Sequence, residues 1–338
     1  MTSPRSAFGA SPQGDDASGP AQSDPRRLIA RVRPLRRALH GVLLLDKPIG
    51  WTSNDALQKV KGLLRAEKGG HTGTLDPLAT GLLPLCFGAA TKFSQVSLDA
   101  DKRYRASLHL GQRTTTGDRE GAVVEERPAP TDAALLQAAV ARFQGEIEQQ
   151  PPMFSALKHR GRALYEYARD GIEVDRATRC VTIHCIDIVG WQSPTLVIDV
   201  HCSKGTYIRT LAEGIGETLG CGAHLAALQR TGCGLLTLEG AVTIDALGEM
   251  TEPEREALLH PVDSLLAAWP EVRLPDGEAG RFLTGLRRQL PPSSHPADLP
   301  AVRVYADHPR AFLGAAHITA GVLIADRLLS PLEVQAQP

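Results

Sequence analysis

One eighteen-residue segment, Lys68 to Leu85 (KGGHTGTLDPLATGLLPL), limits the folds open to this chain more than any other part of it. Four glycines and two prolines surround its single acid, Asp76, and the segment ends in an apolar run. Glycines let a backbone bend and approach a partner closely, and an apolar strand is a rigid support for the side chain before it. An Asp-Pro dipeptide alone would indicate an ordinary surface turn. The whole segment, with His71 and Thr72 beside the acid, instead predicts a carboxylate held against a large ligand.

Three other motifs accompany this segment: Gly41 to Asp55 (GVLLLDKPIGWTSND), Asp101 to Arg105 (DKRYR) and Cys202 to Arg209 (CSKGTYIR). In this order, the four motifs resemble those of the TruB family of pseudouridine synthases, which convert a uridine in the T loop of transfer RNA into pseudouridine. The resemblance covers the chain as far as about residue 235. Beyond residue 250 the chain is similar to a domain type, the PUA-type RNA-binding β-barrel, more than to a sequence.

The composition allows two domains but gives no overall sign of an RNA partner. The chain has 338 residues, 42% of them hydrophobic, and a net charge of -1. A phosphate backbone responds to clustered basic residues, not to the average charge. Three clusters exist, at 102–105, at 158–162 and in six arginines between Arg26 and Arg37. Each cluster alone is typical of a solvated surface. The first two lie next to the motifs, which favours RNA binding for them.

Cysteine spacing and hydropathy indicate a reduced, cytoplasmic protein. The six cysteines include no C-x-x-C pair, so neither a zinc knuckle nor a redox pair is predicted. The dipeptides 184–185 and 201–202, each His-Cys, fall on neighbouring predicted strands and could meet, but ordinary strand packing is the expectation and no metal site is predicted. No run of about 18 apolar residues is present, so no membrane association is expected.

Periodicity predicts four parts: a disordered Arg-rich tail at 1–38, a catalytic domain at 39–250, a linker at 251–270 and the PUA-like domain at 271–330. Strands mixed with helices, without a regular βαβ repeat, favour an α+β fold. We expect a largely antiparallel mixed sheet of the pseudouridine synthase type with flanking helices, plus a small C-terminal β-barrel. The expected strands are 41–45, 82–87, 103–110, 153–157, 181–189, 195–202, 302–305, 311–316 and 322–325, and the expected helices start after Thr52 or Ser53, after Thr131, and at Tyr207.

The resemblance assigns roles to individual residues. It implies that Asp76 acts on the ribose, that Arg209 pairs with this carboxylate, and that Tyr104 stacks on a flipped uracil. Without the motifs, Arg209 would be a phosphate contact or surface residue and Tyr104 a core tyrosine. Tyr207 and Leu228 would complete the pocket wall.

The remaining assignments concern the RNA. A base in a folded loop must leave its stack before an enzyme reaches it. His71 would take the vacated place, although it could simply satisfy loop backbone groups. Phosphate contacts, which position RNA without reading its sequence, are expected from five basic residues. They are Lys47, Lys92, Lys102, Arg103 and Arg105.

The expected reaction is the isomerisation of uridine 55 in the tRNA T loop. It needs no cofactor, metal or energy source, because the glycosidic bond is broken and remade through another atom of the same base. We expect a monomer with no obligate protein partner. A catalytically inert RNA-binding protein or tRNA chaperone on the same fold is the alternative, which the joint presence of Asp76, Tyr104 and Arg209 disfavours. A hydrolase using Asp76 alone lacks the second carboxylate that glycoside hydrolysis usually employs.

Overall fold

The computed structural model describes residues 35–275, 277–291 and 294–337. The predicted disordered tail therefore falls almost entirely outside the described residues. At its end, Arg37 pairs with Glu256, with 2.9 Å between Nη2 and Oε2, and also contacts Glu252. Arg37, which lies before the predicted boundary at residue 39, is thus already held by tertiary contacts. Within the described residues, no helix is long and apolar enough to cross a membrane.

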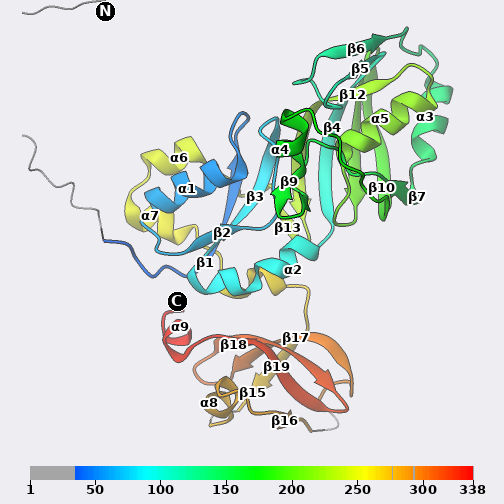
Figure 1. The fold of residues 1–338 in the computed structure, drawn as a ribbon. Coiled ribbons are helices and arrows are strands. Elements are labelled where there is room, and N and C mark those ends of the chain that lie inside the picture. Colours follow the sequence, from blue (N-terminus) through cyan, green and yellow to red (C-terminus); the bar gives the residue numbers. More distant parts are fainter. Residues whose placement is uncertain (1–34, 276, 292–293, 338) are drawn as a thin grey trace, which may run out of the picture. The chain divides into compact units, whose positions relative to one another are not determined.

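A ten-stranded sheet organises the larger part of the described chain (Figure 1). Its main order is β14-β1-β3-β12-β4-β11-β10-β7, with β2 paired to β3 and β13 paired to β12. Only the pairs β1/β14 and β3/β12 are parallel among its described strands. The predicted α+β fold with a largely antiparallel mixed sheet is therefore confirmed. The strands are β1 (Gly41–Lys47), β2 (Gly69–His71), β3 (Ala79–Phe87), β4 (Lys102–Leu110), β7 (Gly145–Gln149), β10 (Arg179–Gln192), β11 (Thr195–Cys202), β12 (Ala223–Cys233), β13 (Leu236–Thr237) and β14 (Val242–Thr243).

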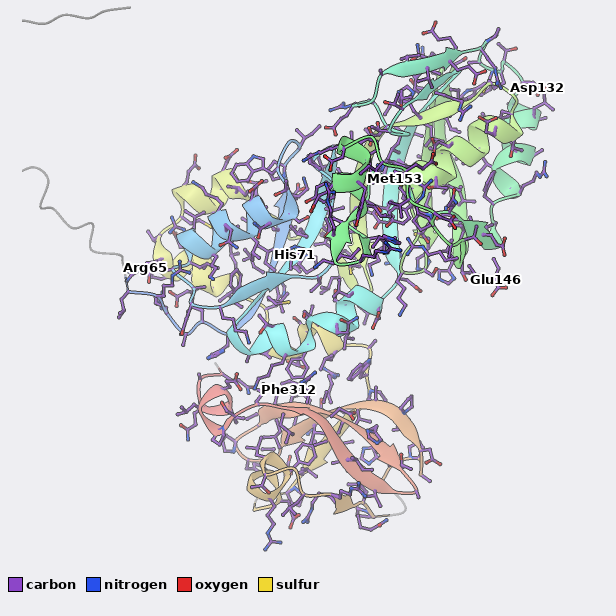
Figure 2. The ribbon with its side chains drawn as sticks, viewed as in Figure 1. Arg65, His71, Asp132, Glu146, Met153 and Phe312 are labelled. Atoms are coloured by element: carbon purple, nitrogen blue, oxygen red, sulfur yellow. The ribbon has the colours of Figure 1, made fainter. Side chains whose placement is uncertain are left out.

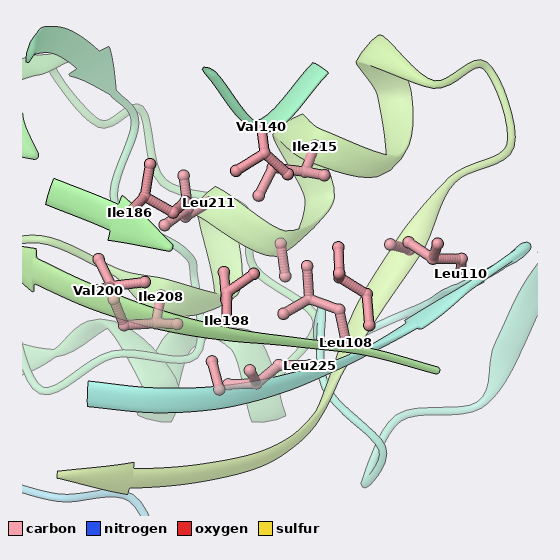
Figure 3. Close-up of a cluster of buried hydrophobic side chains, with 14 of the residues drawn as sticks. Leu108, Leu110, Val140, Ile186, Ile198, Val200, Ile208, Leu211, Ile215 and Leu225 are labelled. Atoms are coloured by element: carbon pink, nitrogen blue, oxygen red, sulfur yellow. The ribbon is translucent and has the colours of Figure 1, made fainter. Parts of the chain in front are cut away.

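Two groups of helices flank this sheet. Figure 1 shows α1 (Ser53–Leu63), α6 (Ile244–Glu249) and α7 (Glu252–Ala257) together, and α3 (Ala133–Ala141) beside α5 (Ile208–Thr218). Apolar residues of α5 and α3 pack on the inner faces of β4, β10, β11 and β12 (Figure 3). Each aliphatic side chain buried there contributes roughly 1.5 to 3 kcal/mol. This packing fixes the start of α5, which carries Arg209, against the sheet.

Most predicted elements of this part are confirmed, with two corrections. The residue that caps α3 is Asp132 rather than Thr131, because its carboxylate accepts hydrogen bonds from the backbone N–H groups of Ala134 and Leu135. The strand predicted at 153–157 is wrong, since these residues form bends that precede a hairpin. The smaller elements here are η2 (Gly88–Phe93), α2 (Ser94–Asp99), β5 (Gln112–Thr114), β6 (Val123–Glu126), β8 (Lys158–His159), β9 (Arg162–Ala163) and α4 (Leu164–Arg169).

The segment 251–270, predicted as a linker, contains α7 and the 3-10 helix η3 (Val262–Leu266). His260 exchanges two backbone hydrogen bonds with Val42 of β1, at 2.8 and 3.0 Å. Val262 and Leu266 are buried in the same apolar cluster as Val42. This segment therefore packs against the large sheet and does not behave as an extended connection.

A second sheet of five strands, in the order β15-β17-β18-β19-β16, forms the C-terminal part. Its own core includes Val272, Phe282 and Val304. Three of its strands cover and extend those expected from the sequence, and the PUA-like architecture is confirmed as a half-barrel. The elements are β15 (Glu271–Leu274), α8 (Glu278–Leu283), β16 (Arg288–Gln289), β17 (Leu299–Ala306), β18 (Ala311–Thr319), β19 (Val322–Leu328) and α9 (Pro331–Gln335).

Candidate active site

Asp76 lies in the loop that joins β2 to β3, and neighbouring segments hold this loop in place. The Ser53 hydroxyl accepts a hydrogen bond from the Leu75 N–H at 2.8 Å and donates to the Leu75 carbonyl at 3.1 Å. On the other side of the acid, the Pro77 carbonyl accepts from the Gly50 N–H at 2.8 Å. Both residues adjacent to Asp76 are thus fixed by the motif at 41–55. The Asp76 side chain itself remains 44% exposed, so it is rigidly mounted and accessible.

Arg209 is the cation that faces this carboxylate. It lies in the first turn of α5, its side chain is 6% exposed, and its Nη2 is 2.9 Å from Oδ2 of Asp76. The same nitrogen donates to the Phe154 carbonyl at 2.6 Å. The predicted proximity of Asp76 and Arg209 is therefore present in the structure, although the two are 133 positions apart.

A second carboxylate, Asp118, contacts Arg209 from the side opposite Asp76. Its Oδ2 is 3.6 Å from Nη1 of Arg209, and its side chain is 7% exposed. Its Oδ1 accepts hydrogen bonds from the Thr116 hydroxyl at 2.6 Å and the Glu120 N–H at 3.1 Å. A buried charge needs partners, and here one guanidinium is shared by two acids. The sequence analysis did not identify Asp118 as a site residue, because the local Thr-Gly-Asp sequence does not indicate that it contacts a distant helix.

A cavity of about 260 Å³ opens beside Asp76. Tyr104 contributes one wall from β4, and burial raises the pKa of its hydroxyl to about 12, so the ring stays neutral. Tyr207 precedes α5, and the guanidinium of Arg179 lies 4.6 Å from its ring centroid. Leu228 of β12 pairs with Ala79 of β3 and faces the same space. The cavity thus brings together the predicted pocket residues Tyr104, Tyr207 and Leu228.

Arg230 supports the loop from beneath and was also missed by the sequence analysis. It is 1% exposed; its Nε donates to the Leu82 carbonyl at 2.7 Å, and its Nη2 is 3.3 Å from the Gly73 carbonyl. Strand β12 passes so close that a Cβ on Gly81, at φ +96°, would meet the Arg230 carbonyl oxygen at 2.4 Å. A buried guanidinium with backbone acceptors thus connects Gly73, in the loop that carries Asp76, to Leu82 of β3.

Two predicted phosphate contacts do not fit the structure. Lys47 is 0% exposed, and its Nζ donates to the carbonyls of Pro48 and Trp51 at 2.9 and 2.7 Å. Lys102 is 8% exposed, and its Nζ donates to the carbonyls of Ser97, Leu98 and Ala100 at the end of α2. Cations commonly satisfy the free carbonyls at the end of a helix. The ammonium groups of both lysines are therefore engaged by backbone carbonyls.

The other predicted RNA contacts occupy varied positions. Lys92 pairs with Glu333 at 2.6 Å and is half-buried. Arg105 is exposed in a two-pronged pair with Asp199, at 2.7 and 2.8 Å, and Arg103 is exposed. His71 lies on β2 (Figure 2). Within the described residues its Nδ1 has no hydrogen-bond partner, and burial followed by the charge of Arg230 lowers its pKa, so the ring is neutral near pH 7.

Comparison with known proteins gives the same family over residues 61–329. The family profile described as "TruB family pseudouridylate synthase (N terminal domain)" matches residues 61–208. Those described as "tRNA pseudouridylate synthase B C-terminal domain" and "Pseudouridine synthase II TruB, C-terminal" match residues 209–267 and 270–329.

Individual relatives are similar over most of their length. A protein of Cupriavidus pinatubonensis (strain JMP 134 / LMG 1197) named tRNA pseudouridine synthase B is 58% identical over 300 residues, covering 87% of this chain and 95% of the relative. One of the same name from Ralstonia pickettii (strain 12J) is 57% identical, with coverages of 88% and 96%. A chain in a solved Cbf5-Nop10-Gar1 complex shares the fold at a TM-score of 0.67 and 24% identity, covering 88% of this chain and 87% of that one. The chain therefore belongs to the TruB family of pseudouridylate synthases.

Proposed function

We propose that this protein converts uridine 55 in the T loop of tRNA into pseudouridine, with Asp76 as the catalytic carboxylate. The ion pair between Asp76 and the buried Arg209 at 2.9 Å, at a cavity lined by tyrosines, is the observation that carries this proposal. The names of the close relatives support the tRNA substrate. The choice of uridine 55 rests on the motif resemblance.

The geometry suits an isomerisation at a sugar carbon. The bond from N1 to C1′ of the ribose breaks, a bond from C5 to C1′ forms, and the proton lost from C5 is matched by one gained at N1. An ionised carboxylate can either attack C1′ or remove the C2′ proton, and both uses need it charged and fixed. Arg209 places an opposite charge 2.9 Å from the Asp76 carboxylate, while two hydrogen-bonded neighbours fix the loop. No atom or electron is supplied from outside the base and the sugar.

The aromatic walls suit a base that must turn over between bond breaking and bond formation. Stacking on an aromatic ring contributes roughly 1 to 3 kcal/mol per base and tolerates rotation better than directional hydrogen bonds do. Tyr104 provides that surface, and its neutral hydroxyl keeps a negative charge away from Asp76. His71, on the strand before the catalytic loop, is proposed to replace the extruded base in the RNA stack.

Exposed basic residues are proposed to bind phosphates. Arg103 and Arg105 flank Tyr104 on β4, and Lys158 and Arg160 are exposed on the β8–β9 hairpin. The pair of Arg105 with Asp199 is exposed and contributes little stability, so it can open to release the guanidinium. We further propose that the PUA-like domain adds contacts to tRNA and that the protein acts as a cytoplasmic monomer.

The direct test is to incubate the purified protein with unmodified tRNA in the absence of nucleotides and to map pseudouridine by mass spectrometry. Turnover is expected at uridine 55, and none on a matched tRNA that carries cytidine at this position. A T-arm hairpin in buffer with EDTA should also be modified. Binding without turnover would instead favour the inert RNA-binding alternative, and modification at another uridine would contradict the proposed site.

A further inference from the structure

Three side chains of the metal-binding type meet outside the catalytic cavity, where β10 and β11 approach the residue before β4. They are Asp101, His184 and His201, and their ligand atoms all lie within 4.8 Å of one another. Nε2 of His184 is 3.1 Å from Oδ2 of Asp101, and Nε2 of His201 is 3.8 Å from the same oxygen. None of the three is among the residues lining the Asp76 cavity in the described chain, so the proposed reaction leaves this cluster without a role.

A β-bulge brings the two histidines together. Ile183 pairs with Cys202 and Cys185 with His201, so His184 is an extra residue on β10 opposite a single step of β11. Bulges redirect a side chain while the rest of the ladder continues. As a result the two imidazole rings are 4.8 Å apart on one face. Asp101 is fixed by its own backbone, whose carbonyl accepts a hydrogen bond from the Gly234 N–H at 2.8 Å.

The cysteines of the two His-Cys dipeptides do not join the cluster. Cys202 is 0% exposed, in the apolar core that includes α5. Cys185 donates from Sγ to the Asp187 carboxylate at 3.1 Å. The ligand set is therefore two imidazoles and one carboxylate, which is a common set for zinc and related transition metals.

Two of the three ligand-atom separations are close to those around a small tetrahedral ion, and all three lie within 4.8 Å. Zinc bonds of about 2.0 to 2.2 Å at tetrahedral angles separate two ligand atoms by roughly 3.4 Å. The two measured separations to Asp101, 3.1 and 3.8 Å, lie on either side of this value. The three side chains are 34 to 44% exposed, so an ion can enter and a water molecule can occupy the fourth position.

We propose that Asp101, His184 and His201 form a binding site for a divalent transition-metal ion, with Zn²⁺ as the preferred occupant. The nearby guanidinium of Arg103 opposes the charge of the ion, so the affinity is expected to fall below that of closed structural zinc sites. This inference stands independently of the proposed function and departs from the sequence-based expectation of no metal.

A bound ion would connect β10, β11 and the residue that leads into β4. Asp101 is three positions before Tyr104, so the ion would stiffen the start of the strand that carries the stacking residue. It would leave Asp76 and Arg209 unchanged. Zinc is therefore expected to raise the melting temperature, while pseudouridine formation on a T-arm hairpin continues in EDTA.

The test is calorimetric titration of the full-length, untagged protein with ZnCl₂ at pH 7.5, together with Co²⁺ titration followed by visible absorption. One ion per chain is expected. His184→Ala and His201→Ala should each weaken binding at least about tenfold and remove the cobalt spectrum of nitrogen and oxygen ligands. Circular dichroism and hairpin modification verify that these variants are folded, since both side chains are partly exposed.

Two matched variants serve as controls. His317→Ala removes a histidine that contacts Asp326 at 2.8 Å on β18 and β19, outside the cluster. Cys185→Ser removes the thiol next to the site. Both should bind zinc as the unchanged protein does. The proposal is overturned if the unchanged protein shows no saturable binding, if His184→Ala binds equally well, or if Cys185→Ser abolishes binding while the histidine variants do not.

Discussion

The two sides of the catalytic cavity hold their buried cations in different ways. On the α5 side, Arg209 faces two carboxylates, Asp76 and Asp118. On the loop side, Arg230 and Lys47 donate to backbone carbonyls. Both sides are buried and both border the same loop, yet only the first contains an acid that takes part in the proposed chemistry.

The difference indicates that the cation on the α5 side affects the proposed reaction, whereas the cations on the loop side stabilise the loop. A cation paired with a carboxylate opposes the charge of that acid and fixes its position, whereas a cation bonded to carbonyls fixes the path of the backbone. Changes on the α5 side should therefore appear first in the rate of reaction. Changes on the loop side should appear first in the stability of the fold.

The largest effect is expected for Asp76→Asn, which keeps the size of the side chain and removes its charge. Turnover should fall by about 10³-fold or more, because the reacting group is lost. The Kd for tRNA should stay within about tenfold, since phosphate contacts and stacking provide most of the affinity. Single-turnover assays and filter binding measure the two quantities. Substantial turnover by this variant would remove Asp76 from the proposed role.

Arg209→Lys should come next. A single ammonium cannot span Asp76, Asp118 and the Phe154 carbonyl as the planar guanidinium does. We expect kcat to fall about 100-fold, because Asp76 is no longer held in one position. The free energy of unfolding should fall by less than in the loop-side variant below, because the ammonium still opposes the charge of the buried Asp118.

Asp118→Asn is the matched variant on the far side of the same guanidinium. It keeps an oxygen for the Thr116 hydroxyl and the Glu120 N–H, so it should remain folded with about a tenfold loss in kcat. If Arg209→Lys lost stability without losing rate, the assignment of catalytic control to the α5 side would be wrong.

Arg230→Met tests the loop side. Removing the guanidinium leaves the Leu82 and Gly73 carbonyls without this donor, which should cost about 1 to 3 kcal/mol in urea unfolding. We expect only about a tenfold loss in kcat, arising from a less rigid loop. A loss in rate as large as that of Arg209→Lys, with stability unchanged, would break the distinction between the two sides.

The smallest effect is a pH dependence at Lys47. Burial lowers the pKa of Lys47 to about 8, with the Arg230 charge acting in the same direction and Asp76 opposing. Between this value and the usual 10.5 the unfolded chain binds a proton that the folded chain has released, so the stability of the folded state rises with pH in this window. The expected rise is about 1 to 3 kcal/mol relative to Lys47→Met. Urea unfolding at pH 7.5, 9 and 10.5 measures it, with the exposed Lys204→Met as control, and equal slopes in all three proteins would contradict it.

Residues whose role follows from local sequence were predictable. Alternation along 103–110 placed Tyr104 on the side of the cavity, and the helical period after Tyr207 placed Arg209 in a first turn. The segment Lys68 to Leu85 forms the predicted loop followed by a buried strand. In each case periodicity or a glycine-rich turn decides the backbone without help from distant residues.

Residues whose role depends on distant pairing were not predictable. Asp118 reaches Arg209 only because the turn after β5 lies beside α5, and Arg230 reaches Gly73 only because β12 pairs with β3. The roles of lysines are also hard to predict, because a basic residue in an RNA-binding family suggests a phosphate contact. Lys47 and Lys102 instead satisfy backbone carbonyls within five positions of themselves, and composition alone does not reveal that choice.

The position of β12 in the sheet determines when the sheet can assemble during synthesis of the chain. This strand, residues 223–233, lies between β3 and β4, which precede it by more than a hundred positions. Until β12 has been synthesised, β3 and β4 each have an unpaired edge. Such edges can form hydrogen bonds with strands of other chains. The two walls of the cavity join only when β12 arrives and closes both edges at once. An N-terminal fragment that stops short of residue 223 would therefore carry Asp76, Tyr104 and Arg209 and still have no assembled pocket.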